Sequence, residues 1–309
     1  MPSVEKYSKA VYDLKTNSFR ISKVKGKYNL KGPLKVCVQI TRKCNLRCSY
    51  CSEPEPIKEL SLAQIKVLFK RLKAAGVLFL SITGGEPLVR KDFRKIISLA
   101  KNLGFGIALD SNAVLIDSDM ASFLAKKAVY VNTSLDGGPE KHNKLRGCYS
   151  EVISGIKALR SKSIPVIVST VLLGDCIDDA KQVLKEAESL GVMLVKFLAP
   201  IPRGRLSGLK LSSEKKRLDG IWKSLSDFKA AEGLSVSMTL SDWASMGKGS
   251  LIIMHPDGNA FGSPAIGEKD CLVPFGNLLE EPVERLWENY AFKESHVRKY
   301  AQETVRFKK

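Results

Sequence analysis

Short hydrophobic segments alternate with longer amphipathic segments between residues 34 and 199. The short segments are rich in Val, Ile, Leu and Phe, which indicates buried strands, and the longer ones repeat their apolar residues at helical spacing. We therefore expect strands at 34–40, 77–83, 105–111, 129–135, 165–173 and 192–199. The intervening helices are expected at 62–76, 91–104, 118–128, 150–162 and 178–191.

Six strands that alternate with helices predict a parallel sheet with right-handed crossovers, buried on both faces. A closed eightfold barrel would need two more units, and the alternation stops near residue 199. The expected fold class is therefore α/β, with a partial (β/α)6 barrel. In barrels of this kind the chemistry lies at the carboxyl ends of the strands.

The pattern changes in the last third of the chain. A loop, "PIPRGRLSG", precedes an expected helix at 212–231, short strands are expected within 234–264 around a Pro-Asp-Gly turn, and a helix is expected within 281–303. We expect three parts, which are a basic N-terminal segment at 1–33, the partial barrel at 34–200, and a small α+β module at 201–309.

Charge is concentrated at the two ends of the chain. The formal net charge is +18, and residues 1–43 hold 11 Lys and Arg against 2 Asp and Glu. Such ends can bind RNA, an acidic peptide or an anionic cofactor precursor, or they can simply keep the surface soluble. No aromatic-interleaved nucleic-acid motif accompanies the charge, which favours the last interpretation.

The sequence shows neither a long apolar run nor an apolar signal core, so we expect a cytoplasmic protein without a membrane partner. In that setting the seven cysteines are expected to be thiols or metal ligands.

Three of these cysteines follow the first expected strand. Cys44, Cys48 and Cys51 stand in the stretch "ITRKCNLRCSYCSEP" with C-x3-C-x2-C spacing. Three thiolates can hold three irons of a [4Fe–4S] cube and leave the fourth open to a ligand from outside the protein. The alternative, a zinc knuckle, needs a fourth Cys or His, and none lies close in the sequence.

This arrangement resembles the radical S-adenosylmethionine (radical SAM) superfamily. The resemblance implies that SAM binds the open iron through its methionine part. It also implies that an electron from the cluster cleaves SAM to a 5′-deoxyadenosyl radical, which takes hydrogen from a substrate. A low-potential reductase is implied as a partner. Tyr50 matches the aromatic position that packs on adenine.

A second motif, "SITGGEP", follows the second expected strand. Two glycines permit a close approach of the backbone. The resemblance assigns Gly84, Gly85, Glu86 and Pro87 to binding the SAM amino group. An ordinary turn between a strand and a helix is the alternative.

Further segments match the same family. By resemblance, Asn112 lies near the pocket, Ser134 and Arg146 contact the SAM carboxylate, and Asp136 lies near the ribose or the substrate. A guanidinium suits a carboxylate because it can bind it bidentately. The "KFLAP" segment after the sixth strand corresponds in that family to the backbone that frames adenine, so the resemblance implies that Phe197 and Leu198 lie near adenine. His142 is expected to be a surface or capping residue.

The last third resembles the SPASM or twitch extension of radical SAM maturases of peptides and cofactors. Its frame is present in "GKGSLIIMHPDGNAFGSP" and "FGNLLEEPVERLW", but Ala244 and Ser263 stand at about the positions of two cluster ligands. We therefore expect a twitch-like module without an auxiliary cluster, which caps the barrel and shapes the substrate pocket. A cluster rebuilt from Cys148, Cys176 and Cys271 is the alternative.

The other cysteines and acids are weaker candidates. Cys37 is expected to be a small buried residue. Cys148 and Cys271, and with them Cys176, are candidate hydrogen-atom donors. Asp242, Asp257 and Glu268 are candidate acids or bases, although Asp257 suits a turn.

Three functions follow from the sequence. The first is a radical SAM enzyme with one [4Fe–4S] cluster that acts on a peptide or a cofactor precursor. The second keeps this chemistry on RNA, because of the basic ends. The third is a non-catalytic scaffold that binds SAM or the cluster.

Overall fold

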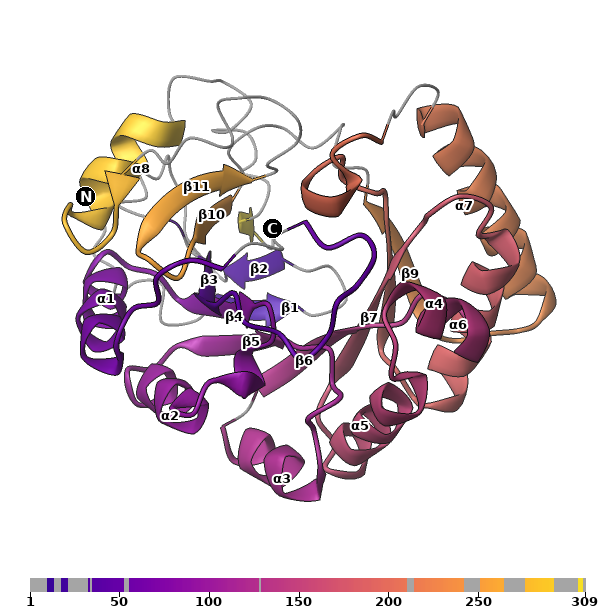
Figure 1. Cartoon of the computed structure of the whole chain (residues 1–309), viewed down its shortest axis with the longest axis horizontal. Helices are drawn as coiled ribbons and strands as arrows, with labels where there is room; N and C mark the ends of the chain where they lie inside the picture. The colour runs from indigo at the N-terminus through magenta and orange to yellow at the C-terminus, as the bar shows by residue number, and fades with distance from the viewer. Residues whose placement is uncertain are drawn as a thin grey trace.

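The computed structural model describes residues 10–13, 18–21, 33, 35–52, 56–127, 129–209, 214–241, 251–263, 276–291 and 305–307. The described chain is built around one curved sheet with helices along its outer rim (Figure 1). Among the described residues, no helix is both long enough and apolar enough to cross a bilayer.

The six expected strands are all present and parallel. They are β3 (Lys35–Thr41), β4 (Phe79–Gly84), β5 (Gly106–Asp110), β6 (Val129–Ser134), β7 (Val166–Val171) and β8 (Leu194–Leu198). The helices between them are α1 (Leu62–Ala74), α2 (Phe93–Asn102), α3 (Ser118–Lys126), α5 (Tyr149–Ser161) and α6 (Ile177–Ser189). Two short 3-10 turns, η2 (Pro87–Val89) and η3 (Gly204–Leu206), follow β4 and β8.

Helix α1 shows how local chemistry fixes an element. Its N-terminus is a capping box, because the Ser61 hydroxyl accepts a hydrogen bond from Gln64 N and the Gln64 side chain accepts one from Ser61 N. Its buried side chains recur at Ile65, Leu68, Phe69 and Leu72, which is the spacing of one helix face. The helix therefore packs one apolar face on the sheet.

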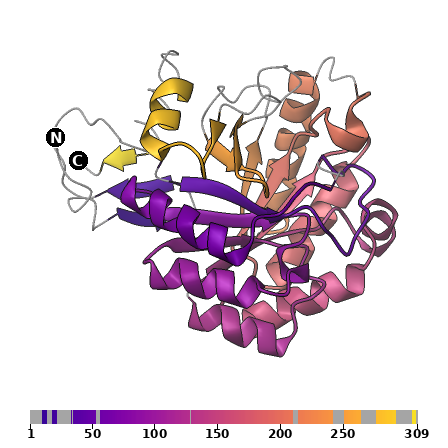
Figure 2. The ribbon, with the colours of Figure 1, turned by 60° about the vertical axis from the view of Figure 1, so that its left-hand side comes forward.

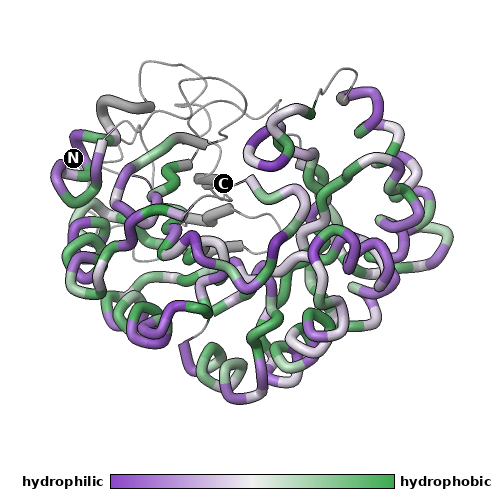
Figure 3. Tube along the Cα trace, in the orientation of Figure 1, coloured by the Kyte–Doolittle hydropathy of each residue, from purple (hydrophilic) through white to green (hydrophobic). Residues whose placement is uncertain are grey.

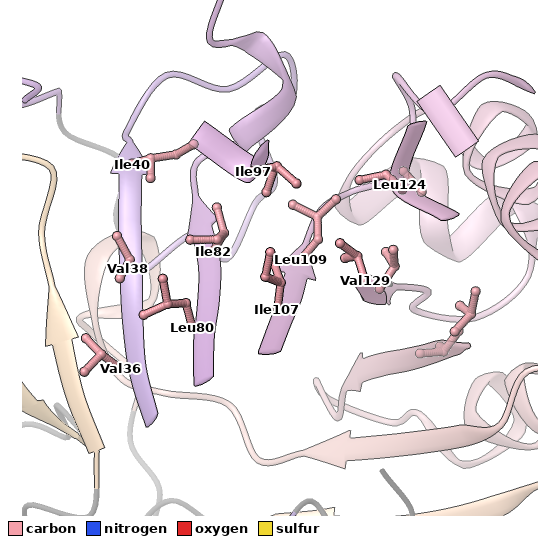
Figure 4. Packing of buried hydrophobic residues seen from close by; sticks show 14 of the residues in the cluster. Val36, Val38, Ile40, Leu80, Ile82, Ile97, Ile107, Leu109, Leu124 and Val129 are labelled. Atoms are coloured by element: carbon pink, nitrogen blue, oxygen red, sulfur yellow. The ribbon is translucent and has the colours of Figure 1, made fainter. Parts of the chain in front are cut away.

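The core lies between the sheet and the helices. Figure 4 shows Val36, Val38 and Ile40 of β3 beside the buried side chains of β4 and β5. Each fully buried aliphatic side chain contributes about 1.5–3 kcal/mol relative to exposure. The hydropathy tube shows the same pattern, with green strands inside helices that alternate between green and purple (Figure 3).

The inner face of the sheet differs from our expectation of strands buried among apolar residues on both faces. On β3 every second residue is only half-buried, and these residues are Lys35, Cys37 and Gln39. Polar groups continue across the sheet, where Asp110 accepts hydrogen bonds from Ser81 Oγ (2.7 Å) and Asn132 Nδ2 (2.5 Å). The inner face of the sheet is therefore partly polar, because it lines a cavity and is not filled by a packed apolar core.

The parallel sheet also extends further than the alternation indicated. After α7 (Glu214–Ala231), strand β9 (Ser237–Ser241) pairs in parallel with β8. On the other edge, β10 (Leu251–Met254) pairs in parallel with β3 and forms an antiparallel hairpin with β11 (Asn259–Ser263). The sheet order is β12-β11-β10-β3-β4-β5-β6-β7-β8-β9, and its two edge strands do not pair with each other.

The remaining elements complete the C-terminal third and a small sheet. Strand β12 (Gly276–Asn277) pairs with β11, and α8 (Val283–Ala291) follows it with Trp287 buried. Strands β1 (Ala10–Asp13) and β2 (Ser18–Ile21) form a separate sheet with β13 (Val305–Phe307), which lies alongside β2 (Figure 2). Helix α4 (Pro139–Leu145) lies in a segment for which no helix was expected.

Candidate functional site

A cavity of about 370 Å³ lies at the carboxyl ends of the central strands. This size falls within the range of about 300–1,000 Å³ typical of small-molecule sites. Eight of the residues expected from the sequence line it together, and these are Cys44, Cys48, Tyr50, Cys51, Gly84, Gly85, Arg146 and Leu198. The cavity thus brings together residues from the ends of several strands, where a barrel fold places its chemistry.

The three cysteines lie on the loop that follows β3, here called the cysteine loop (residues 42–51). Backbone hydrogen bonds hold it in place, from Gly85 N to Thr41 O (2.9 Å), from Glu86 N to Lys43 O (2.9 Å) and from Ser49 N to Leu145 O (2.8 Å). The loop is therefore tied to the segment that follows β4 and to the last residue of α4.

Several N–H groups point at the thiols. Leu46 N lies 3.4 Å from Cys44 Sγ, and Arg146 Nη1 lies 3.9 Å from Cys48 Sγ. Burial raises the pKa of Cys44 and of Cys48, while the Arg146 charge lowers the pKa of Cys48 in part. Thiols of this kind become thiolates when a metal replaces their protons.

The two glycines have a clear steric role. A Cβ on Gly85 would lie 2.6 Å from Arg42 O, and one on Gly84 would overlap Thr41 O. Only glycine lets the end of β4 approach the cysteine loop this closely. This packing accounts for both glycines and leaves their backbone on the cavity wall.

Glu86 and Pro87 lie behind this wall and do not line the cavity. The Glu86 carboxylate is fully buried and accepts hydrogen bonds from Leu88 N (3.1 Å), Asn112 N (2.7 Å) and Ser111 Oγ (3.0 Å). Burial raises the pKa of Glu86 to about 7. In this structure Glu86 therefore joins the ends of β4 and β5, and Pro87 opens the turn η2.

Asp136, Tyr50 and Arg146 form one buried network. The Tyr50 hydroxyl and Arg146 Nε both donate to Asp136 Oδ2, and Val171 N donates to Asp136 Oδ1 at 2.8 Å. The Arg146 guanidinium also stacks 4.8 Å from the centre of the Tyr50 ring. Burial raises the pKa of Tyr50 well above its usual value. The network fixes a guanidinium at the cavity while Asp136 stays behind it.

The other expected SAM-binding residues are more scattered. Asn112 donates to Asn45 Oδ1 (2.8 Å) beside Cys44, and thereby supports the cysteine loop. Phe197 is fully buried in the core, while its neighbour Leu198 lines the cavity. Ser134 is half-buried at the end of β6 and does not line the cavity.

The additional cysteines lie away from the cavity wall where they can be described. Cys148 caps α5 in a left-handed conformation with φ 59°, Cys176 is buried beside Arg217, and Cys37 is half-buried on β3. Cys271, Ala244, Asp242 and Glu268 lie outside the described residues. Ser263 ends β11, and Asp257 accepts hydrogen bonds from Asn259 in the hairpin turn, as expected of a turn residue.

The expectation for His142 was wrong. The side chain is fully buried on α4, and its Nδ1 accepts a hydrogen bond from Asp136 N at 3.2 Å. Burial lowers the pKa of His142 to about 4. His142 thus supports the backbone of Asp136, and the helix that carries it begins at the Gly138-Pro139 pair.

Three of the polar side chains on the cavity wall were among the residues that sequence reasoning did not single out. Gln39, Arg42 and Arg205 line it beside the cysteines. Arg205 also holds the cysteine loop, because its backbone N donates to Cys51 O (2.9 Å) and its Nη1 donates to Cys48 O (2.6 Å). Gln39 lies within β3, Arg42 follows β3 directly, and Arg205 lies in η3, so no shared motif marked these three residues in the sequence.

Comparison with known proteins agrees with this geometry. The model of the Radical SAM superfamily matches residues 38–187. The sporulation killing factor maturation protein SkfB of Bacillus subtilis is 29% identical over 181 residues, 56% of this chain and 44% of that protein. The AdoMet-dependent heme synthase of Methanosarcina barkeri is 25% identical over 83% of this chain and 82% of that protein.

Solved structures show the same fold. Streptococcus suis SuiB bound to S-adenosylmethionine has a TM-score of 0.72 at 15% identity, over 84% of this chain and 66% of SuiB. The structure of anSMEcpe with bound AdoMet and the Cp18Cys peptide has a TM-score of 0.69 at 20% identity, over 89% of this chain and 84% of that protein.

The family model matches the barrel, from within β3 to within α6. The chain spans less than half the length of SkfB and of the heme synthase of Oleidesulfovibrio alaskensis, which is 29% identical over 55% of this chain. The matched residues begin within β3 and include the cysteine loop, the two glycines and Arg146. Residues 38–187 of this chain therefore form a domain of the Radical SAM superfamily.

Proposed function

We propose that this chain is a radical SAM enzyme that binds one [4Fe–4S] cluster through Cys44, Cys48 and Cys51 and binds SAM in the adjoining cavity. One observation carries the proposal, which is that the three thiols, the two glycines and Arg146 line a single cavity. When bound, the cluster and SAM would supply reductive cleavage of the sulfonium bond and a 5′-deoxyadenosyl radical.

The donor set fits an iron–sulfur cube. Three thiols on a short loop, with N–H groups aimed at Cys44 and Cys48, match the thiolate ligands and sulfur hydrogen bonds of such clusters. Within the described part of the chain, no three His, Cys, Asp or Glu side chains converge on one metal ion. A cube does not require such convergence, because each thiolate binds a different iron.

Residues of the chain that line the cavity would bind SAM. The wall at Gly84 and Gly85 presents backbone and excludes side chains, so a ligand can lie against it. Arg146 presents a fixed cation that suits the SAM carboxylate, and Asp136 holds that cation in place. Leu198 supplies an apolar contact on the cavity wall.

The names of two relatives support a substrate class. One is named for the maturation of a peptide factor and another for heme synthesis, so the proposed substrate is a peptide or a cofactor precursor. The scheme also requires an external low-potential reductant.

Cluster assembly tests the ligand assignment. Anaerobic reconstitution should give about four irons per chain, and adding SAM should change the EPR spectrum of the reduced cluster. The Cys48→Ala variant should bind no cluster iron and should show no EPR spectrum of a reduced cluster. Cys148→Ala, which removes a thiol away from the cavity wall, is the matched control and should keep both. Equal iron in the two variants would contradict the assignment.

A further inference from the structure

Polar side chains also lie inside the barrel, below the cavity. The cavity is lined by Gln39 of β3 and Leu198 of β8. Lys196 stands two residues before Leu198, so its side chain leaves the same face of the sheet about 7 Å further down the strand. Together with Asp110 and Asn132 it forms a group here called the polar layer. The proposed binding of the cluster and SAM uses none of the three.

The polar layer contains one satisfied carboxylate and one unsatisfied amide. Asp110 accepts from Asn132 Nδ2 at 2.5 Å and from Ser81 Oγ at 2.7 Å, so each of its oxygens has a donor. Asn132 Oδ1 is buried and has no hydrogen-bond partner among the described residues, and the same holds for Gln39 Oε1 at the cavity above. Buried acceptors are hydrogen-bonded as a rule, so these two oxygens point to a ligand that donates.

Lys196 supplies donors to the same interior. Strand β8 stands five places from β3 in the sheet order, which would be about 24 Å in a flat sheet. Yet burial, then the charge of Lys35 on β3, lower the pKa of Lys196 to about 8, and the charge of Asp110 acts in the opposite direction. These charges reach one another because the sheet curves, with β3 and β7 on opposite arms (Figure 1).

The Lys196 ammonium has no hydrogen bond to any residue in the described part of the chain. A lysine ammonium has three donors and no acceptor. The interior therefore offers one cationic donor and two neutral acceptors, from strands β8, β3 and β6, to a single polar group.

We propose that the polar layer and Gln39 bind the side-chain amide of an Asn or Gln residue in a peptide substrate. The amide oxygen would accept from Lys196, and the amide N–H groups would donate to Gln39 Oε1 and Asn132 Oδ1. An amide combines an acceptor with donors, whereas a carboxylate has acceptors only and would also face Asp110. This inference rests on the proposed function and specifies a peptide as its substrate.

The experiment measures peptide binding to the reconstituted full chain in the presence of SAM, by fluorescence anisotropy. The probes are three fluorescein-labelled heptapeptides of glycine and alanine that differ only at the central position, which is Gln, Glu or Met. The Gln peptide should bind about tenfold more tightly than either of the others, because it alone matches both the donor and the acceptors.

Lys196→Met removes the ammonium at similar side-chain length. It should abolish most of the preference for the Gln peptide over the Met peptide, and Lys196→Arg should restore part of it. The matched control is Lys73→Met, which removes a half-buried lysine from α1, where it donates to Gly104 O at 3.1 Å. This control should keep the full preference, which separates a site from the general effect of losing a lysine.

Four outcomes overturn the inference. The first is that the Gln peptide does not bind or is not preferred, and the second is that the Glu peptide binds most tightly, which would indicate a carboxylate site. The third is that the preference survives in Lys196→Met. The fourth is that Lys196→Met weakens SAM as much as it weakens the peptide, which would assign Lys196 to the SAM site. Failure of the wild-type holoprotein to cleave SAM would instead reject the proposed function, so the two failures are distinguishable.

Discussion

At the scale of single residues, Asp136 joins Tyr50 and Arg146 in a buried network beside the cavity. Its carboxylate is nearly fully buried and pairs with Arg146, whose side chain is 13% exposed. Asp136→Ala should lower the free energy of unfolding by about 3 kcal/mol, because it leaves a buried guanidinium without its counter-charge. Urea denaturation of the cluster-free chain measures this loss.

A surface pair supplies the comparison for Asp136. Asp119 pairs with Arg94, but its side chain is 79% exposed. Asp119→Ala should change stability by less than about 1 kcal/mol. If Asp136→Ala and Asp119→Ala lower the free energy of unfolding equally, Asp136 does not act as a buried counter-charge to Arg146.

The buried histidines predict an acid-sensitive fold. The pKa of His142 falls from 6.5 to about 4 on folding. Between these values the unfolded chain binds a proton that the folded chain does not, so stability falls as the pH drops through this window. His142 alone should lower the free energy of unfolding by about 2 kcal/mol at pH 5 relative to pH 7.

The variant His142→Asn isolates this effect, because Asn can still accept from Asp136 N but does not titrate. Its unfolding free energy should depend less on pH than that of wild type, by about 2 kcal/mol between pH 7 and pH 5. Parallel pH profiles for the two proteins would show that His142 is protonated equally in the folded and unfolded chains.

At the residue scale, the sequence predicted the cysteines, the glycines and Arg146, because their spacing forms a recognisable pattern. Arg42 and Arg205 could not be predicted, since a single arginine in a loop resembles any surface arginine. The partners that give them a role are the hairpin residue His255 and the carbonyl of Cys48, and only the folded chain brings these together.

At the scale of elements, the turn η3 clamps the cysteine loop. Gly204 has φ +60°, and a Cβ there would lie 2.6 Å from Ser52 C. Gly204→Ala should therefore push η3 away from the cysteine loop and weaken SAM binding about tenfold, because both the φ value and the contact disfavour a side chain. Isothermal titration of the reconstituted protein measures the change.

Gly208 is the control in the same loop. A Cβ at Gly208 meets nothing within 4 Å, so Gly208→Ala should bind SAM as wild type does. If Gly204→Ala and Gly208→Ala bind SAM with equal affinity, the contact between η3 and the cysteine loop does not contribute to SAM binding.

The hydrophobic pattern predicted all six strands of the barrel and the five helices between them, because these elements carry strong periodicity. It missed β9 as part of the sheet, since "SMTLS" is short and all five of its residues are only half-buried. It also missed α4, whose seven residues are too few for a clear repeat. Short elements take their conformation from neighbours in the fold, which the local pattern does not contain.

At the scale of the whole molecule, the C-terminal third is joined to the barrel. Strand β10 pairs with β3, Leu60 N donates to Pro256 O at 2.7 Å, and Arg71 on α1 donates to the carbonyl of Leu279. The part expected at 201–309 as a small module therefore contributes strands to the main sheet. It remains a prediction that this part has lost an auxiliary cluster.

This continuity predicts one cooperative unfolding transition. The three tryptophans, at 222, 243 and 287, report on the C-terminal third, whereas far-UV circular dichroism reports on the whole chain. The two signals should share one midpoint in urea, because unpairing β10 exposes β3. Separate midpoints would indicate an independently folding module.

The central claim is that the cavity beside the cysteine loop supports reductive cleavage of SAM. The most direct measurement incubates reconstituted protein, loaded with about four irons per chain, with SAM and dithionite, and quantifies 5′-deoxyadenosine by chromatography. We predict that 5′-deoxyadenosine forms with wild type and is absent with Cys48→Ala. A fully loaded wild-type protein that produces none, with or without a peptide or cofactor-precursor candidate, would contradict the account.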